Sequence, residues 1–231
     1  MERAKEAPMS DTMTVRERRE VAAFRAVELR YFGHLHLSQG SAPSVEVEGD
    51  PDVVAKVHAR VAGDTLILEI GETWLERLTS GVLLIAHRPL HYHVTVPELD
   101  RVAVTGTGKV EASGLVTSDL EVTASGAADV TISNLEVHAL KAQISGRGSF
   151  RLAGKAEAFE LRISGSGEVE AAQLACQSAE IRISGQGTTS VRVAKRLDVR
   201  ISGLGTVRYH GDPTVTQTNS GSGTVTQIDA G

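Results

Sequence analysis

The stretch from Phe159 to Gly187 decides the fold, and it reads FELRISGSGEVEAAQLACQSAEIRISGQG. It contains the same motif twice, as Ser164-Gly165-Ser166-Gly167 and as Ser184-Gly185-Gln186-Gly187. Before each motif, apolar and polar residues alternate, and a period of two is typical of a strand with one buried face. The stretch therefore indicates a strand, a corner rich in glycine, and a second strand.

The Ser-Gly-x-Gly motif is repeated along the second half of the chain. Intact copies, the first with Thr in place of Ser, occupy residues 105–108, 145–148, 164–167, 184–187, 202–205 and 220–223, and a degenerate copy occupies 125–128. The copies start 18 to 20 residues apart, which fits one coil of a β-solenoid whose coils pair in parallel. We predict an all-β fold: a single-domain, right-handed parallel β-helix of 18–20-residue Ser-Gly-x-Gly coils.

Glycine suits the corners of such coils because it accepts positive φ without a steric penalty. On this ground the corner glycines are predicted to be structural. They are Gly106, Gly108, Gly146, Gly148, Gly165, Gly167, Gly185, Gly187, Gly203, Gly205, Gly221 and Gly223.

The chain divides into a short lead and one long domain. Residues 1–20 are dominated by charged side chains and are predicted to be flexible. Residues 21–231 are predicted to form one β-helical domain, since no linker rich in Pro or Gly interrupts them. Within this domain, 21–100 are interpreted as irregular early coils and 101–228 as the regular repeats.

Two segments depart from the repeat. Residues 71–81 are predicted to be a loop with one helical turn that holds Trp74. In the last coil the inward positions are Val215, Gln217 and Asn219, where earlier coils carry aliphatic residues. Polar residues there are predicted to cap the end of the solenoid, because they discourage further strand pairing. The alternative is a polar contact surface for another chain.

The composition excludes several classes of protein. The chain has 24 Lys and Arg against 29 Asp and Glu, a net charge of −5, so it has no basic field to hold nucleic acid. Its one cysteine excludes an internal disulfide. No apolar run approaches the roughly 20 residues of a membrane span, and none near the start is typical of a secretory signal. On these grounds alone the sequence predicts a cytoplasmic protein with no membrane span and no nucleic-acid partner.

Two columns of charged side chains are expected on the outside of the solenoid. In three successive coils the residue two positions before the motif serine is basic: Arg162, Arg182 and Arg200. The residue four positions before it is acidic: Glu160, Glu180 and Asp198. Consecutive coils would place them about 4.8 Å apart. The columns could form a polar groove for a sugar, an anionic polymer or a partner. Alternatively, they form a solvated sheet face on which opposite charges offset one another.

No residue pattern indicates catalysis. Enzymes that cleave polysaccharides on β-helices use clustered carboxylates, but here no extra Asp or Lys breaks the periodicity at one coil. We therefore predict no enzyme and no catalytic residue, with a polysaccharide-active enzyme as a distant alternative. Cys176 is expected to be a small packed residue rather than a nucleophile.

Histidines occur in pairs two residues apart, as His34 and His36 and as His91 and His93. This spacing places each pair on one face of a strand, where it could bind zinc. It equally describes ordinary exposed strand residues, and no third ligand is identifiable. We therefore predict no metal and no cofactor.

The repeated Ser-Gly-x-Gly after an alternating strand resembles the bacterial GIN-domain family of auto-transporter adhesin heads. Four further segments carry the resemblance: Gln39-Gly40 with Val45–Asp50, Gly63–Ile67, Val94–Leu99 and Arg208–Pro213. It covers residues 21–228 and implies a β-helical, non-enzymatic domain of the cell envelope or surface. The resemblance carries no catalytic residues over to this chain.

The expected function is therefore a non-catalytic, adhesion-type binding module of the bacterial cell envelope. Its partner would be a glycan, an envelope component or a second copy of the chain. The alternative is a cytoplasmic scaffold that associates with itself, which the lack of a signal segment in this sequence favours.

Overall fold

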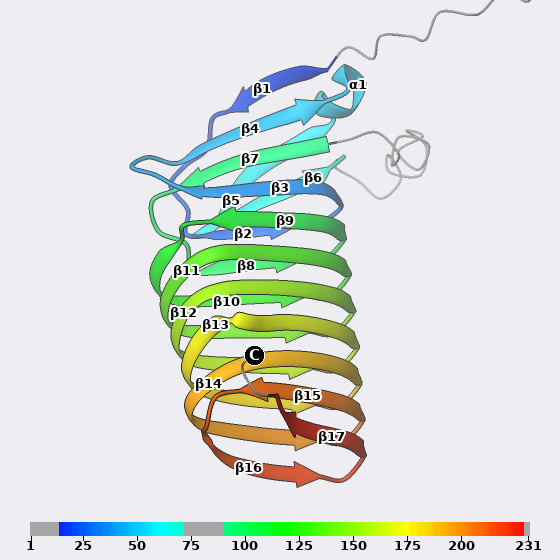
Figure 1. Cartoon of the computed structure of the whole chain (residues 1–231). Coiled ribbons are helices and arrows are strands. Elements are labelled where there is room, and N and C mark those ends of the chain that lie inside the picture. Colours follow the sequence, from blue (N-terminus) through cyan, green and yellow to red (C-terminus); the bar gives the residue numbers. More distant parts are fainter. Residues whose placement is uncertain (1–13, 72–89, 229–231) are drawn as a thin grey trace, which may run out of the picture.

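The computed structural model describes residues 14–71 and 90–228, which form a parallel β-solenoid of about six turns (Figure 1). Its elements in chain order are β1 (Val15–Arg19), β2 (Ala26–Leu29), β3 (Phe32–Gln39), β4 (Ser44–Gly49), α1 (Pro51–Val54), β5 (Val57–Ala62), β6 (Thr65–Ile70), β7 (Leu90–Val96), β8 (Arg101–Val104), β9 (Thr107–Ser113), β10 (Val116–Ala124), β11 (Ala127–Ile144), β12 (Arg147–Ile163), β13 (Ser166–Ile183), β14 (Gln186–Ile201), β15 (Leu204–His210), β16 (Thr214–Asn219) and β17 (Ser222–Gln227). The predicted helical turn around Trp74 lies outside the described residues.

The regular repeats stack as predicted. Each long strand from β11 to β14 begins after one glycine corner and ends before the next, and it pairs in parallel with the strand one coil away. The inward positions before the corners are buried: Ile163, Ile183 and Ile201 are each 1% exposed. Burial of these aliphatic columns between the sheet faces explains why the sequence alternates with a period of two.

The corner glycines are required for a reason other than the predicted one. The glycines with positive φ are Gly33, Gly63, Gly71, Gly114, Gly154 and Gly211, and none of them belongs to a Ser-Gly-x-Gly motif. The expectation of positive φ at the corners is therefore wrong. At Gly185, a Cβ would instead collide with the carbonyl oxygen of Gly165 in the coil before it. The first glycine of each motif is needed because two backbones approach too closely for a side chain.

The same close approach supplies hydrogen bonds between corners. The backbone N–H of Gln186 donates to the carbonyl oxygen of Gly165 over 2.9 Å, and that of Ser184 donates to Ile163 over 2.9 Å. The second glycine of the motif faces inward, where a Cβ at Gly187 would lie 2.9 Å from Cδ1 of Ile163. Each intact motif thus combines a backbone contact with a packing contact.

The first part of the chain does not follow sequence order along the axis. The coil formed by β2 and β3 lies between β8 and β9 on one side and β6 and β7 on the other, with all of these pairs parallel. The chain then closes this end with antiparallel pairs, β4 with β7 and β5 with β6. The early part therefore forms coils, but these coils do not stack in the order in which their strands follow one another in the sequence.

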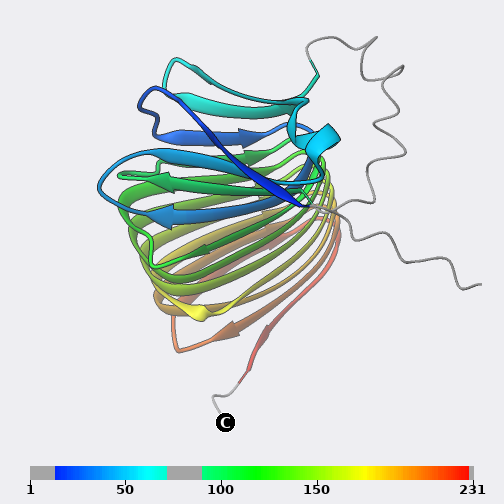
Figure 2. The same cartoon turned by 90° about the horizontal axis from the view of Figure 1, so that it is seen from above.

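Strand β1 corrects the predicted extent of the flexible lead. Residues 15–19 pair antiparallel with β4 and, together with α1, cover the end of the solenoid (Figure 2). Arg16 forms an ion pair with Glu46, from its Nη2 to Oε2 over 2.6 Å. Arg16 also approaches Glu48 on β4, whereas Arg19 pairs with Glu17 on β1 itself. Among the described residues, no helix is long and apolar enough to cross a membrane.

The last coil differs from the others at the three positions that the sequence predicted to face inward. Val215, Gln217 and Asn219 are all exposed on β16. Asn219 bridges its own corner, because its Nδ2 donates to the carbonyl oxygen of Gly223 over 2.9 Å while its Oδ1 accepts from the Gly221 N–H over 3.1 Å. This side chain therefore satisfies backbone groups at the end of the stack.

Candidate ligand-binding columns and grooves

The structure stacks the two charged columns in register. On β12, β13 and β14, Arg162 lies beside Arg182 and Arg182 beside Arg200. The acidic positions are paired in the same way: Glu160 with Glu180, and Glu180 with Asp198. All six side chains point outward because they alternate with the buried aliphatic positions. The arginine side chains are between 38% and 51% exposed.

The columns pair with each other to form an ion-pair ladder. Nε of Arg162 lies 2.5 Å from Oε1 of Glu160, and Arg182 pairs with Glu180 in the next coil. Arg200 reaches back one coil, with its Nη1 2.8 Å from Oε1 of Glu180. Because these pairs are exposed, each contributes only about 0–1 kcal/mol to stability. The ladder is formally neutral and presents alternating donors and acceptors to solvent.

An open groove runs along the arginine column, and we call it the arginine groove. It has a volume of about 520 Å³ and lies between the arginines and the motif serines. Its lining includes Ser164, Ser184 and Ser202, and it extends from Gln143 to Thr218 at its ends. The arginine groove therefore follows the solenoid axis over several coils.

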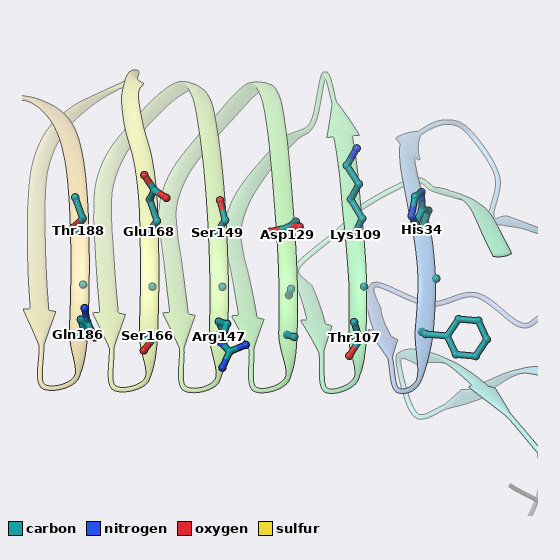
Figure 3. Close-up of a pocket in the computed structure, with 18 of the residues that line it drawn as sticks. His34, Thr107, Lys109, Asp129, Arg147, Ser149, Ser166, Glu168, Gln186 and Thr188 are labelled. Carbon is teal, nitrogen blue, oxygen red and sulfur yellow. The ribbon is translucent and has the colours of Figure 1, made fainter. Parts of the chain in front are cut away.

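A second and larger groove lies on the other side of the corner, and we call it the glycine groove (Figure 3). Its volume is about 1080 Å³, and it crosses the coils from β3 to β14. Figure 3 shows two rows of side chains on either side of the second motif glycines. One row is Thr107, Arg147, Ser166 and Gln186, and the other is His34, Lys109, Asp129, Ser149, Glu168 and Thr188. The space between the rows is free of side chains because the position between them faces inward.

Sequence reasoning missed the glycine groove. Its walls come from the variable positions on either side of the second motif glycine, which change from coil to coil and so form no repeated charge pattern. The signal that could have identified it is the pair of outward positions that flanks the inward second position of each motif. When the coils stack, these two positions form parallel rows along the axis with a channel between them.

Cys176 is placed as predicted, as a small packed residue. It is 3% exposed, and its Sγ donates to the carbonyl oxygen of Leu174 over 3.6 Å. Burial raises the pKa of the thiol to about 12, so the reactive thiolate is not formed at neutral pH.

The two histidine pairs are brought together by the doubled-back start of the chain. His34 and His36 lie on β3, and they pair in register with His91 and His93 on β7. The sequence placed each pair on one strand face but could not show that these two strands are neighbours. The cluster is thus a feature of the topology rather than of any local motif.

The fold and its surface define a class: a parallel β-solenoid of short Ser-Gly-x-Gly coils with open polar grooves along its axis. The chain belongs to the family described as "Putative auto-transporter adhesin, head GIN domain", whose model matches residues 23–213. The resemblance in the sequence is thereby confirmed, and the family is one of adhesion-type modules.

Solved structures share this fold at low sequence identity. A putative adhesin from Bacteroides fragilis is 23% identical with a TM-score of 0.82, and 94% of this chain covers 98% of it. A putative lipid binding protein from Parabacteroides distasonis is 17% identical with a TM-score of 0.72, and the match covers 94% of this chain and 98% of that protein. A putative adhesin from Parabacteroides merdae is 19% identical with a TM-score of 0.67, and the match covers 94% of this chain and 97% of that protein. No match was found among curated proteins.

Proposed function

We propose that this protein is a non-catalytic, adhesion-type binding module of the bacterial cell envelope that holds a glycan along its coils. The observation that carries the proposal is the ion-pair ladder in strict register beside the arginine groove. Membership of a family of adhesin heads supports the envelope location.

The chemistry of the ladder favours a hydroxyl-rich polymer. Guanidinium groups only donate hydrogen bonds, carboxylates only accept them, and serine hydroxyls do both. A sugar hydroxyl also donates and accepts, so a glycan can bond to the arginines and serines that line the arginine groove and to the carboxylates beside them. A polyanion would gain less, because each arginine already neutralises a carboxylate of the protein.

The repeat of the coils favours a polymer over a small molecule. Equivalent groups recur about every 4.8 Å along the axis, so one chain can make the same contact in successive coils. Such contacts are individually weak, at about 0.5–1.5 kcal/mol for each hydrogen bond. Their sum over several coils would supply useful affinity.

Replacing Arg162, Arg182 and Arg200 together by serine is expected to weaken glycan binding about tenfold or more. Three lost hydrogen-bonding groups at these energies account for a change of that size. Binding is measured by biolayer interferometry against a panel of neutral and uronic-acid polysaccharides. For a neutral glycan, the affinity of the wild type should change little with salt.

The matched control replaces three exposed cations elsewhere, Lys155, Lys195 and Arg208, by serine. It changes the net charge by the same amount but leaves the ladder intact, so it should retain wild-type affinity. Equal loss in both variants would assign the effect to net charge and remove the arginine groove as the site. A failure of the wild type to bind any polysaccharide in the panel would contradict the proposal.

A further inference from the structure

Four histidines lie in mutual contact across the boundary between β3 and β7, and we call them the histidine cluster. The ring of His36 is stacked on that of His91, with centroids 5.4 Å apart, and on that of His93 at 4.9 Å. His34 contacts His91 edge-on at 5.0 Å. Histidine is the side chain whose ordinary charge change lies between about pH 5 and pH 8. The charge at this boundary between two strands therefore depends on pH.

The boundary attaches the end of one sheet face to the rest of the solenoid. Along this face the strands follow the order β9, β3, β7, β4 and β1 (Figure 1). On this face, β7, β4 and β1 are thus joined to the coils through β3, and we call them the end strands. Leu35 and Leu37 of β3 and Tyr92 and Val94 of β7 are buried on the inner side. Separation of β7 from β3 would expose this part of the core.

The hydrogen bond inside the cluster requires a neutral ring. Nε2 of His36 and Nδ1 of His91 are 3.1 Å apart, so one nitrogen donates and the other accepts with its lone pair. Oε2 of Glu111 lies 3.4 Å from Nδ1 of His36, and we assign the proton of neutral His36 to that nitrogen. Nε2 of His36 then accepts from His91. A second proton on His36 would occupy Nε2, remove the acceptor and set two N–H groups against each other.

The surroundings of the cluster offset little added positive charge. Among the described residues, the charged groups on the same outer face of β1, β4 and β9 are Arg16, Arg18, Glu46, Glu48, Lys109 and Glu111. Their formal charges sum to zero. Glu46 pairs with Arg16, and Glu111 pairs with Lys109. Glu48, whose Oε2 lies 3.1 Å from Nε2 of His93, can balance one imidazolium. Further protons in the cluster would meet like charges at stacking distance.

The packing of the rings therefore favours their neutral form. Burial lowers the pKa of His36, as does the neighbouring His93, against the opposing effect of Glu111. Burial and the neighbouring His34 lower the pKa of His91. In separated strands both histidines would have the ordinary pKa of about 6.5. Well above that pH neither state is protonated, and the packing keeps its full stability. As the pH falls below about 6.5, separated strands bind more protons than packed strands, so the free energy that holds β7 to β3 decreases.

We propose that mild acid loosens the end strands from the solenoid, through protonation of the histidine cluster at the boundary between β3 and β7. His36 contributes most, because its second proton breaks the hydrogen bond to His91 and adds charge beside two further imidazoles. His34 and Leu90 line the β3 end of the glycine groove, so the same event changes the shape of that end of the groove.

The test is hydrogen–deuterium exchange of the full chain at pH 7.5 and at pH 5.5, which lie on either side of the ordinary histidine pKa. Labelling times are scaled for the pH dependence of intrinsic exchange. The protection of β4 and β7 should fall about tenfold or more at pH 5.5. At that pH a separated histidine is about ten parts protonated to one part neutral, and protons favour opening by that factor for each ring that stays neutral when packed. The protection of β12, β13 and β14 should not change.

The double variant His36→Gln, His91→Gln keeps polar side chains at both positions but removes both titrations. Its protection of β4 and β7 should change little between the two pH values. Glu111→Gln should enlarge the loss, because it removes a carboxylate that favours the proton on His36. This second variant keeps both rings in place and tests the same charge balance from the opposite side.

His138→Gln is the matched control, because His138 lies on β11 outside the cluster, with its Nδ1 3.0 Å from Oε2 of Glu157. It should respond to pH as the wild type does. The proposal is overturned if acid leaves the protection of β4 and β7 unchanged in the wild type, or lowers it equally in the double variant. A loss of the same size in β12, β13 and β14 would also overturn it, since the whole chain would then be unfolding.

Discussion

Replacing Gly185 by alanine is expected to cost about 3 kcal/mol or more of the free energy of unfolding. The added Cβ would collide with the carbonyl oxygen of Gly165, and this oxygen also accepts the hydrogen bond from Gln186. Neither backbone can move freely, because β13 and β14 are paired along most of their lengths. Relief of the clash would break the register of a whole coil. Urea unfolding followed by circular dichroism measures the loss.

Gly187→Ala is the control in the same corner. Its Cβ would lie 2.9 Å from Cδ1 of Ile163, which is the end of that side chain, and 3.3 Å from the Cγ2 methyl group of Ile183. Side chains can rotate where a backbone carbonyl cannot, so the expected cost is about 1 kcal/mol. Equal costs for the two alanine variants would show that backbone contact between coils is not what fixes the motif.

Ile183→Asp is expected to abolish folding under conditions in which the wild type is stable. Ile183 is 1% exposed and lies in register between Ile163 and Ile201 in the centre of the stack. An uncompensated carboxylate there costs several kcal/mol, against a total stability of about 5–15 kcal/mol for an ordinary domain. The measurement is the loss of the cooperative thermal transition and of the sheet signal in circular dichroism.

Gln186→Asp introduces the same charge three residues away at an exposed position. It should melt within a few degrees of the wild type, because exposed substitutions change stability by only about 0.5 kcal/mol. A wild-type-like melting curve for Ile183→Asp would contradict the inward assignment of this column, and with it the register of the solenoid.

The regular coils could be predicted because the pattern that defines them lies within short stretches of sequence. Alternation before each corner shows which residues are buried, and the constant spacing shows which strands are equivalent. The columns at Arg162, Arg182 and Arg200 followed directly from that register. The role of the glycines was harder to predict, since the collision at Gly185 involves a residue of the neighbouring coil and depends on how closely the two backbones approach.

The start of the chain could not be predicted in the same way. Alternation identified strands near His34 and His91, but it carries no information about which strands pair over long distances. The insertion of β2 and β3 between two later coils depends on tertiary packing, as does the pairing of β1 with β4. The two histidine pairs lie side by side only because of this order.

The ion-pair ladder could be predicted from the sequence only in part. Sequence spacing predicts that like charges stack, but whether Arg182 faces solvent alone or pairs with Glu180 depends on side-chain geometry. The observed pairing is the arrangement in which opposite charges offset one another, and it leaves a neutral array of hydrogen-bonding groups. It is this array that favours a glycan over an anionic polymer.

The most direct test of the envelope role is the location of the native protein on intact cells. Exposed Lys155 and Lys195 allow labelling with an amine-reactive biotin reagent that does not cross membranes. An adhesion-type module of the cell surface should be labelled on intact cells and recovered with the envelope fraction, while a cytoplasmic marker stays unlabelled. Labelling only after lysis, with recovery in the cytoplasmic fraction, would contradict the envelope role and favour an intracellular scaffold.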